Sequence, residues 1–317
     1  MDVVTIGETM VLLTPESSPF MRYASSYSRK FGGAETNVAI GLTRLGHQTG
    51  WISKVGNDEL GKAMYSFIRG EGVDVSQVQF DPEAPTGLYF KEIRSGDRVQ
   101  VQYYRKGSAA SRLTEDDLNE EYIATAKYLH LTGITPALSE SCYKTVIKAI
   151  DLAKRNNIKV VFDPNLRRKL WSEDRARKVL LEIAAQADII LPGLEEGKFM
   201  FNEEDPDKLG QLFLNHGASL VILKVGARGA YYFTNEKSEL IEGFSVDRVV
   251  DPVGAGDGFA AGLIAGLLEH LPIDQAVRKG NAVGALATMT PGDFEGLPDI
   301  EELDAFINNL SREDIQR

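Results

Sequence analysis

Glycines and carboxylates alternate in one short stretch near the end of the chain. Residues 251–259 read DPVGAGDGF and lead into a run of small and apolar residues that predicts a helix. Gly254 and Gly256 can adopt backbone conformations closed to most residues, so their N–H groups can point to one place at the start of that helix. Such a place suits a phosphate. Asp257 would either cap the first helical turn or face a ligand held there.

Two glycine patterns are typical of nucleotide-binding loops, but both fail on chemistry. Residues 56–63 (GNDELGKA) nearly match a P-loop, yet Ala63 stands where a magnesium-binding hydroxyl is needed, and Asp58 and Glu59 would face the phosphates. The stretch at 254–259 has Phe259 where a dinucleotide fingerprint needs its third glycine. The sequence therefore disfavours a P-loop and a nicotinamide enzyme.

The composition indicates a soluble globular protein. The 317 residues are 43% hydrophobic and 26% charged, which is enough to bury a substantial core. A net charge of −11 argues against a broad surface for nucleic acid or an anionic membrane, although an anionic ligand could still bind a local positive pocket. Cys142 is the single cysteine and the four histidines are scattered, so neither a disulfide nor zinc is expected. With no signal-peptide pattern, we expect a cytoplasmic protein.

Apolar segments alternate with helical patterns along most of the chain. Strands are predicted at residues 2–7, 51–56, 128–133, 160–163, 189–191 and 220–224, and helices at 34–45, 58–71, 139–155 and 172–186. A hairpin near 230–243 and two helices near 273–290 and 299–310 flank the glycine stretch. This alternation predicts an α/β fold with a mainly parallel sheet covered by helices. Because no linker or repeat divides the chain, we expect one domain over residues 1–317.

A hairpin interrupts this pattern between residues 77 and 107. Residues 86–93 and 99–104 are strand-like and flank a turn at 94–97. Together with the segment 12–31, this region predicts a small β-sheet lid beside the main sheet. Aromatic side chains exposed on the hairpin would serve either as lid walls over a ligand or as a subunit interface.

Two motifs resemble the signatures of a known family, the ribokinase-like (PfkB) carbohydrate kinases. They are GGAETNVA at residues 32–39, running on to RLG at 44–46, and DPVGAGDGF at 251–259. The resemblance covers essentially the whole chain and implies a three-layer fold with a lid, and ATP and magnesium as cofactors. It implies that Asp257 is the base that takes the proton of a sugar hydroxyl. Gly254, Ala255 and Gly256 would then stabilise the charge on the transferred phosphoryl group.

Four further motifs look most like those of 2-keto-3-deoxygluconate kinases within that family. They are YYRKGSA at 103–109, LHLTGI at 129–134, DPNLR at 163–167 and GDFEG at 292–296. The resemblance implies phosphorylation of 2-keto-3-deoxygluconate at its terminal hydroxyl, giving 2-keto-3-deoxy-6-phosphogluconate. Arg105 and Arg167 have guanidinium forks that suit the carboxylate of such a sugar, although either could be an ordinary surface ion-pair residue. The alternatives are a kinase of a neutral sugar such as fructose or ribose, and a non-catalytic sugar-binding regulator.

The other site residues follow from their positions in the family motifs. The resemblance implies sugar contacts from Gly33, Asn37, Tyr89, Tyr103 and Asp293, and nucleotide contacts from Asn165, Lys224, Gly226, Gly229 and Asn281. Many relatives carry an Asn-x-x-Glu motif that organises magnesium, but residues 193–196 read GLEE here. Glu196 matches the glutamate, whereas Gly193 cannot supply the asparagine amide. Lids in this family often pair between subunits, which implies a homo-oligomer.

Overall fold

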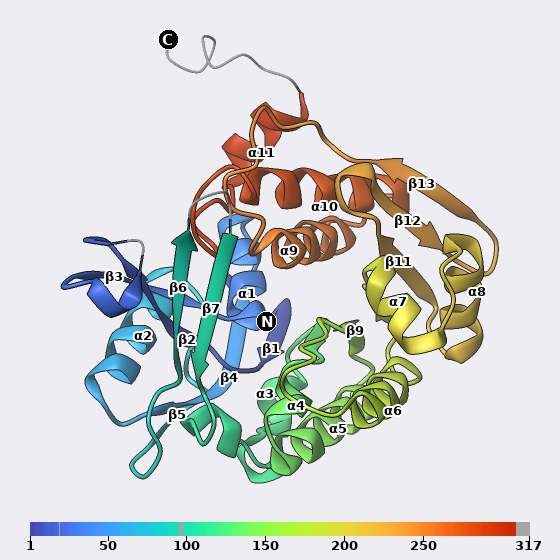
Figure 1. The fold of residues 1–317 in the computed structure, drawn as a ribbon. Helices are drawn as coiled ribbons and strands as arrows, with labels where there is room; N and C mark the ends of the chain where they lie inside the picture. The colour runs from blue at the N-terminus through green and yellow to red at the C-terminus, as the bar shows by residue number, and fades with distance from the viewer. Residues whose placement is uncertain (19, 95–97, 309–317) are drawn as a thin grey trace.

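A large mixed sheet forms the centre of the molecule in the computed structural model, which describes residues 1–18, 20–94 and 98–308 (Figure 1). Its strands lie in the order β13-β12-β11-β10-β9-β8-β1-β4-β5. In chain order they are β1 (Val3–Ile6), β4 (Thr49–Gly56), β5 (Val78–Asp81), β8 (Tyr128–Thr132), β9 (Lys159–Asp163), β10 (Ile189–Ile190), β11 (Leu220–Lys224), β12 (Gly229–Phe233) and β13 (Ser238–Glu242). All neighbours from β11 to β5 pair in parallel, and β12 and β13 add an antiparallel edge.

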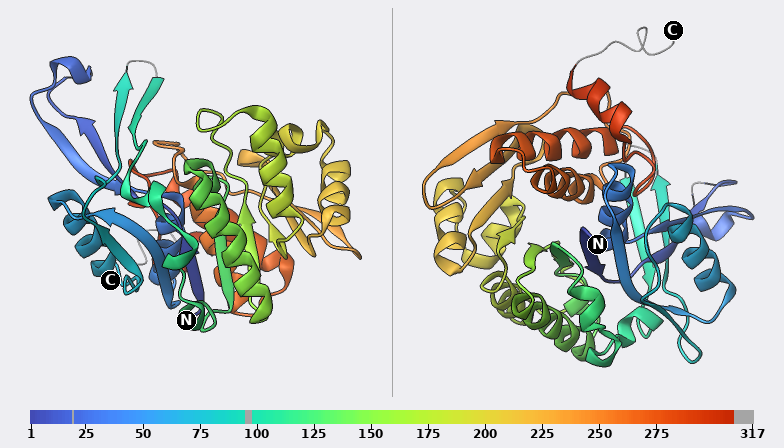
Figure 2. Two further views of the ribbon diagram at one scale, coloured as in Figure 1. Left: turned by 90° about the horizontal axis from the view of Figure 1, so that it is seen from below. Right: turned by 180° about the vertical axis from the view of Figure 1, so that it is seen from behind.

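Helices cover both faces of this sheet, which gives three layers (Figure 2). One face carries α1 (Ala34–Arg44), α2 (Glu59–Gly70), α9 (Ala255–Leu268), α10 (Ile273–Ala287) and α11 (Ile300–Ile307). The other carries α3 (Glu120–Ile123), α4 (Thr135–Leu138), α5 (Glu140–Arg155), α6 (Glu173–Ala184), α7 (Leu194–Phe201) and α8 (Pro206–His216). Successive strand residues point to opposite faces, so Val3 and Val161 pack in the first core while Val4 and Val160 pack in the second. Among the described residues, no helix is long and apolar enough to cross a membrane.

The predicted α/β alternation is confirmed, and the structure adds four helices that were not predicted, α3, α4, α7 and α8. The start of α8 has a clear signal in the sequence, because Asp205 followed by Pro206 is a typical helix start and Asp205 does cap α8. The P-loop-like stretch 56–63 is the ordinary beginning of α2, where the Asp58 carboxylate accepts the N–H of Gly61 at 2.7 Å. Residues 95–97 of the predicted hairpin turn, and 309–310 of the predicted last helix, lie outside the described residues.

Four strands form the predicted lid, which projects from the main body (Figure 2). They are β2 (Met10–Pro15), β3 (Tyr27–Gly32), β6 (Leu88–Arg94) and β7 (Arg98–Tyr104), in the order β3-β2-β6-β7. The lid is narrower than predicted, because residues 78–81 pair in parallel with β4 and belong to the main sheet. The physical reason is that Val78 is buried in the main core with Val73 and Val75.

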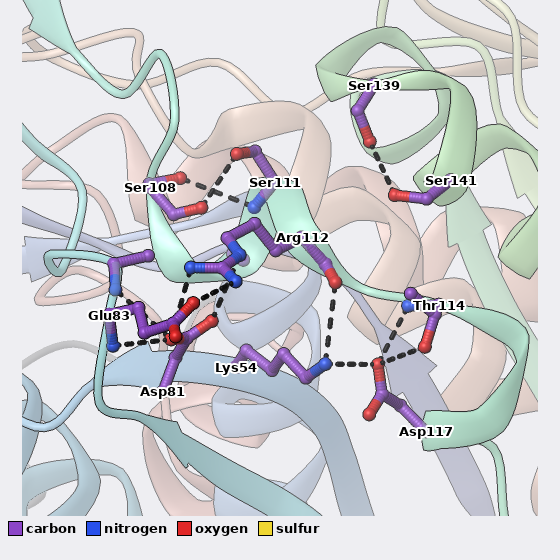
Figure 3. A network of polar contacts seen from close by, with 12 residues as sticks. Lys54, Asp81, Glu83, Ser108, Ser111, Arg112, Thr114, Asp117, Ser139 and Ser141 are labelled. Atoms are coloured by element: carbon purple, nitrogen blue, oxygen red, sulfur yellow. Dashed lines mark hydrogen bonds and ion pairs between the residues drawn. The ribbon is translucent and has the colours of Figure 1, made fainter.

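Polar contacts fasten the chain that leaves the lid to the edge of the main sheet (Figure 3). Lys54 of β4 forms an ion pair with Asp117 at 2.6 Å and donates a hydrogen bond to the carbonyl of Arg112. Arg112 in turn pairs with Asp81 of β5 at 3.4 Å and with Glu83 at 2.9 Å. The end of β7 is therefore followed by a segment held firmly against the main sheet.

Candidate active site

A cavity of about 340 Å³ lies where the carboxyl ends of the parallel strands meet the lid. At this edge β1 has β4 on one side and β8 on the other, and such a reversal of strand order opens a crevice in α/β sheets. Most of the predicted site residues come together in its lining. They are Gly33, Asn37, Tyr89, Tyr103, Arg105, Asn165, Arg167, Glu196, Lys224, Gly254, Gly256, Asp257 and Asp293.

A second cavity of about 330 Å³ adjoins the first. Its walls are largely apolar and include Phe244, Val246, Val249 and Phe259. The predicted residues that line it are Lys224, Gly226, Gly229, Ala255, Gly256 and Asn281. Since Lys224, Pro252 and Gly256 line both cavities, the two spaces meet at the glycine turn.

The glycine turn has the backbone geometry of an anion site. Gly254 is the N-cap of α9 with φ +83°, and a Cβ there would fall 2.0 Å from the carbonyl oxygen of Asp293, so only glycine fits. Gly256 differs from the prediction, because it lies inside the helix without a left-handed backbone. A Cβ at Gly256 would lie 3.8 Å from Nζ of Lys224, so its small size leaves room beside that ammonium. Within the described residues, the N–H groups of Gly256 and Asp257 have no hydrogen-bond acceptor.

Asp257 faces the first cavity and does not cap the helix. Its Oδ2 accepts a hydrogen bond from Nδ2 of Asn37 at 2.7 Å, and no N–H of the first turn bonds to it. Burial raises the pKa of Asp257 to about 7; the hydrogen bond from Asn37 opposes the shift and the charge of Asp163 adds to it. Part of its surface stays open to the cavity. A carboxylate with such a pKa can accept a proton near neutral pH.

Arg105 is engaged in a buried ion pair. Its Nε and Nη2 donate to Oε2 of Glu8 at 2.7 and 2.6 Å, and Ser108 donates to the other oxygen of the same carboxylate. The side chains of Glu8 and Arg105 are 0% and 7% exposed. Arg105 is therefore not the surface residue that the sequence left open as an alternative. Its charge is already balanced by Glu8.

Arg167 differs from Arg105 in both exposure and partners. It lines the first cavity and is exposed, and no ion pair or hydrogen bond joins its guanidinium to another described residue. Its positive charge lowers the pKa of Asp257, against the larger effect of burial. Of the two predicted arginines, Arg167 is the one whose fork remains available to an anion.

The two lid tyrosines occupy different positions. The sequence predicted exposed aromatic side chains on the hairpin. Tyr89 is instead buried, and its hydroxyl donates a hydrogen bond to Oδ2 of Asp293 at 2.7 Å. Tyr103 remains 42% exposed, with its ring centroid 5.5 Å from that of Tyr89. Burial, followed by the neighbouring charge of Asp293, raises the pKa of Tyr89 well above its usual value. Tyr89 thus stays a neutral donor that joins the lid to the loop at residue 293.

Three residues predicted to contact a nucleotide also have structural roles. Nδ2 of Asn281 donates to the carbonyls of Ile241 and Glu242 at 3.0 and 3.1 Å, which ties α10 to β13. Gly226 and Gly229 adopt positive φ of 65° and 105°, as turn glycines do. They shape the wall of the second cavity through the backbone.

Lys224 lies at the junction of the two cavities, and Glu196 lines the first cavity. Nζ of Lys224 pairs with Oδ2 of Asp163 at 2.6 Å, so the pKa of the lysine is raised although burial opposes this. The oxygens of Glu196 accept the N–H groups of Leu166 and Gly193, each at 2.8 Å. Burial, followed by the charge of Asp163, raises the pKa of Glu196.

The first cavity is also lined by Glu8, Asp163 and Lys91, for which the sequence predicted no role. Signals for two of them were present. Glu8 lies two residues after the first strand, at the edge where the carboxyl ends of parallel strands gather. Lys91 lies two residues after Tyr89 on one strand, and residues two apart share a face.

Comparisons with known proteins agree with this geometry. A family model described as pfkB family carbohydrate kinase matches residues 1–300. A 2-dehydro-3-deoxygluconokinase of Bacillus subtilis (strain 168) is 43% identical over 312 residues, 97% of this chain and 96% of that protein. The crystal structure of a PfkB protein from Polaromonas sp. JS666 matches with a TM-score of 0.88 and 40% identity, over 96% of this chain and 99% of that one.

A further solved structure resembles this chain and is described as containing ligands. It is a putative ribokinase II from E. coli in complex with ATP and Mg²⁺, with a TM-score of 0.89, 28% identity, and coverage of 97% of this chain and 99% of that one. The family model and the relatives span this chain almost from end to end. The chain therefore belongs to the pfkB family of carbohydrate kinases.

Proposed function

We propose that this protein transfers the γ-phosphoryl group of ATP to the terminal hydroxyl of 2-keto-3-deoxygluconate, also called 2-dehydro-3-deoxygluconate. The observation that carries the proposal is the meeting of two cavities at the Gly254 turn. The apolar cavity suits a nucleoside, and the polar cavity, with Asp257 in its wall, suits a sugar. A phosphoryl group passing between them would lie at the N-terminus of α9, where unpaired N–H groups favour an anion.

In the proposed reaction Asp257 acts as the general base. The sugar hydroxyl gives its proton to the Asp257 carboxylate while its oxygen bonds to the γ-phosphorus of ATP. The bond from that phosphorus to the bridging oxygen of ADP breaks, and ADP leaves with the electron pair. The N–H groups of Gly256 and Asp257 and the ammonium of Lys224 stabilise the charge on the transferred group, which is the main requirement of phosphoryl transfer.

The residues present fit ATP with magnesium held mainly by phosphate and water. Magnesium usually keeps several waters and takes only one or two carboxylates beside substrate phosphates. Over residues 1–18, 20–94 and 98–308, no group of three or more acidic, histidine or cysteine side chains could hold a metal by itself. Glu196 and Asp163, whose oxygens already accept hydrogen bonds, would orient the waters of the ion. When bound, magnesium would neutralise phosphate charge.

A coupled assay of ADP release over keto-deoxy sugar acids and neutral hexoses tests the substrate. We expect turnover to be fastest with 2-keto-3-deoxygluconate, because Arg167 offers an unpaired guanidinium to its carboxylate. Faster turnover of fructose or ribose would instead identify a kinase of neutral sugars. Tight sugar binding without ADP release would identify a non-catalytic regulator.

Replacing Arg167 with methionine should raise KM for the acid sugar by about 10- to 100-fold, the worth of a hydrogen bond to a charged group. KM for fructose and the melting temperature should stay nearly unchanged. Arg168→Met is the matched control, because Arg168 pairs with Glu173 at 3.1 Å and does not line either cavity. Equal effects of Arg167→Met on both sugars would contradict the carboxylate assignment.

The proposed base makes catalysis depend on pH in a defined direction. Asp257 must be ionised to accept a proton, and its pKa is raised to about 7. We therefore expect kcat/KM for the sugar to rise about tenfold per pH unit below pH 7 and to level off above it. A rate that is flat from pH 5 to 8 would contradict this role.

We also propose that residues 1–317 act as one kinase unit and that two copies pair through their lids. Large aromatic side chains support the pairing, since Tyr23 and Tyr104 are exposed on the lid sheet or its connection. Exposed apolar patches are typical of subunit interfaces. The lid would then both cover the sugar and join the subunits.

A further inference from the structure

A lysine of the lid reaches the glycine turn through a buried ion pair. Lys91 lies on β6, and its ammonium donates to Oδ2 of Asp251, the first residue of the DPVGAGDGF motif. Both residues are buried, with 3% and 5% of their surfaces exposed. A second carboxylate oxygen, Oδ1 of Asp293, lies 4.0 Å from the same ammonium. The lid thus places a positive charge directly beneath the turn.

Asp251 holds the backbone on both sides of this contact. Its Oδ1 accepts the N–H of Val253, the residue before Gly254, at 3.2 Å. Its Oδ2 accepts the N–H of Gly292 at 3.2 Å. Gly254 in turn packs against the backbone of Asp293, where any side chain would clash. One carboxylate therefore links the glycine turn to the loop that supports it.

We propose that Lys91 is a positioning residue: by pairing with Asp251 it holds the Gly254 turn in the geometry that phosphoryl transfer requires. The inference rests on the proposed function of that turn. Lys91 acts through Asp251 and does not touch the reacting atoms. An unpaired carboxylate at Asp251 would draw water into the site, and the N–H groups that it orients would lose their fixed direction.

The same arrangement couples the lid to the turn. Tyr89 and Lys91 lie on one face of β6, and they contact Asp293 and Asp251 respectively. When these contacts form, the lid covers the cavity and the turn is braced in the same step. Binding of sugar under the lid would then favour the turn geometry that serves catalysis.

The test uses Lys91→Met, which keeps most of the apolar stem and removes the charge. We expect kcat to fall by about 100-fold, as for a small displacement of catalytic groups, while KM for ATP and sugar changes little. Hydrogen exchange in the peptide covering residues 251–259 should become faster. Hydrogen exchange can be measured whether or not the protein is active. If the wild-type protein phosphorylated no sugar, the proposed function would be refuted, and the exchange measurement would still test the coupling between Lys91 and the turn.

Lys30→Met is the matched control. Lys30 also joins the lid to the same loop, through Glu295 at 2.8 Å and the carbonyl of Pro291 at 3.0 Å, but it is partly exposed and does not contact Asp251. It should leave kcat and the exchange of residues 251–259 within about twofold of the wild type, as for a surface substitution. An equal effect of both substitutions would mean that the loss of either lid contact disturbs the Gly254 turn. Such a result would overturn the specific role of Lys91.

Chemical rescue makes the proposal specific for the charge. In Lys91→Ala, propylammonium matches the lost part of the side chain, and it should restore kcat several-fold, whereas 1-propanol should not. If Lys91→Met folds poorly, Lys91→Met/Asp251→Asn removes both charges and should regain stability while kcat stays low. A normal kcat in folded Lys91→Met would overturn the proposal. A rise of KM confined to the acid sugar would also overturn it, because that result would show a direct contact between Lys91 and the substrate.

Discussion

Asp257→Asn should lower kcat by about three orders of magnitude, within the range that a general base contributes. The folded state should not lose stability, because an asparagine oxygen can still accept the hydrogen bond from Asn37. The substitution should even stabilise the protein at higher pH. The pKa of Asp257 is raised in the folded state, so ionising this group costs folding free energy as the pH rises towards and through about 7. Asparagine does not ionise. Turnover measurements and thermal melts at pH 5 and pH 8 would check both expectations.

Asp58→Ala is the matched control for this prediction, because Asp58 is a true helix cap. Its carboxylate accepts N–H groups from Gly61 and Thr86 at 2.7 and 2.9 Å, and it lines neither cavity. Removing it should cost about 1 to 2 kcal/mol of unfolding free energy. Turnover should remain near normal. If Asp257→Asn behaved like Asp58→Ala, with lower stability and normal kcat, Asp257 would not be the base.

Arg105→Met should destabilise the folded protein strongly. It leaves Glu8 as an unpaired buried carboxylate, and breaking a buried pair in this way costs about 3 to 5 kcal/mol. The hydrogen bond from Ser108 to Glu8 would remain and would reduce the loss of unfolding free energy. Urea unfolding of the variant at neutral pH would measure the change in free energy.

The double variant Arg105→Met/Glu8→Gln separates folding from recognition. Because glutamine carries no charge, the double variant should regain much of the stability that Arg105→Met loses. KM for the acid sugar should nevertheless remain raised if Arg105 contacts the substrate, since the guanidinium is still absent. Recovery of both stability and KM would mean that Arg105 serves only to neutralise Glu8. Failure of the double variant to regain stability would contradict the buried-pair explanation.

The fold was predictable because its signals are local. Short apolar strands alternate with helical segments, and this pattern requires a mainly parallel sheet between helices. Helix α8 was not predicted, although it begins at a clear Asp205–Pro206 start signal. The predicted lid segment at 77–107 began too early, because a strand of four residues does not reveal which sheet it joins.

The sequence by itself determined where the glycine turn lies and which residue types are next to it in the chain. Gly254 and the carboxylate of Asp257 are three residues apart in the chain, so they lie close together before any tertiary contact forms. The motif therefore predicted the site before any contact was known. Its prediction for Gly256 was wrong in detail, because the helix begins one residue earlier than that glycine.

Only the tertiary structure decided which charged side chains of this site pair with one another. Arg105 and Arg167 look alike in sequence, yet one is balanced by Glu8, 97 residues away, while the other has no ion-pair partner in the part of the chain that the structure describes. Asp257 could by its own position either cap the helix or face a ligand, and the fold places Asn37, 220 residues distant, beside its carboxylate. Partners and burial determine the free energy of a charge, and both depend on contacts between segments far apart in the chain.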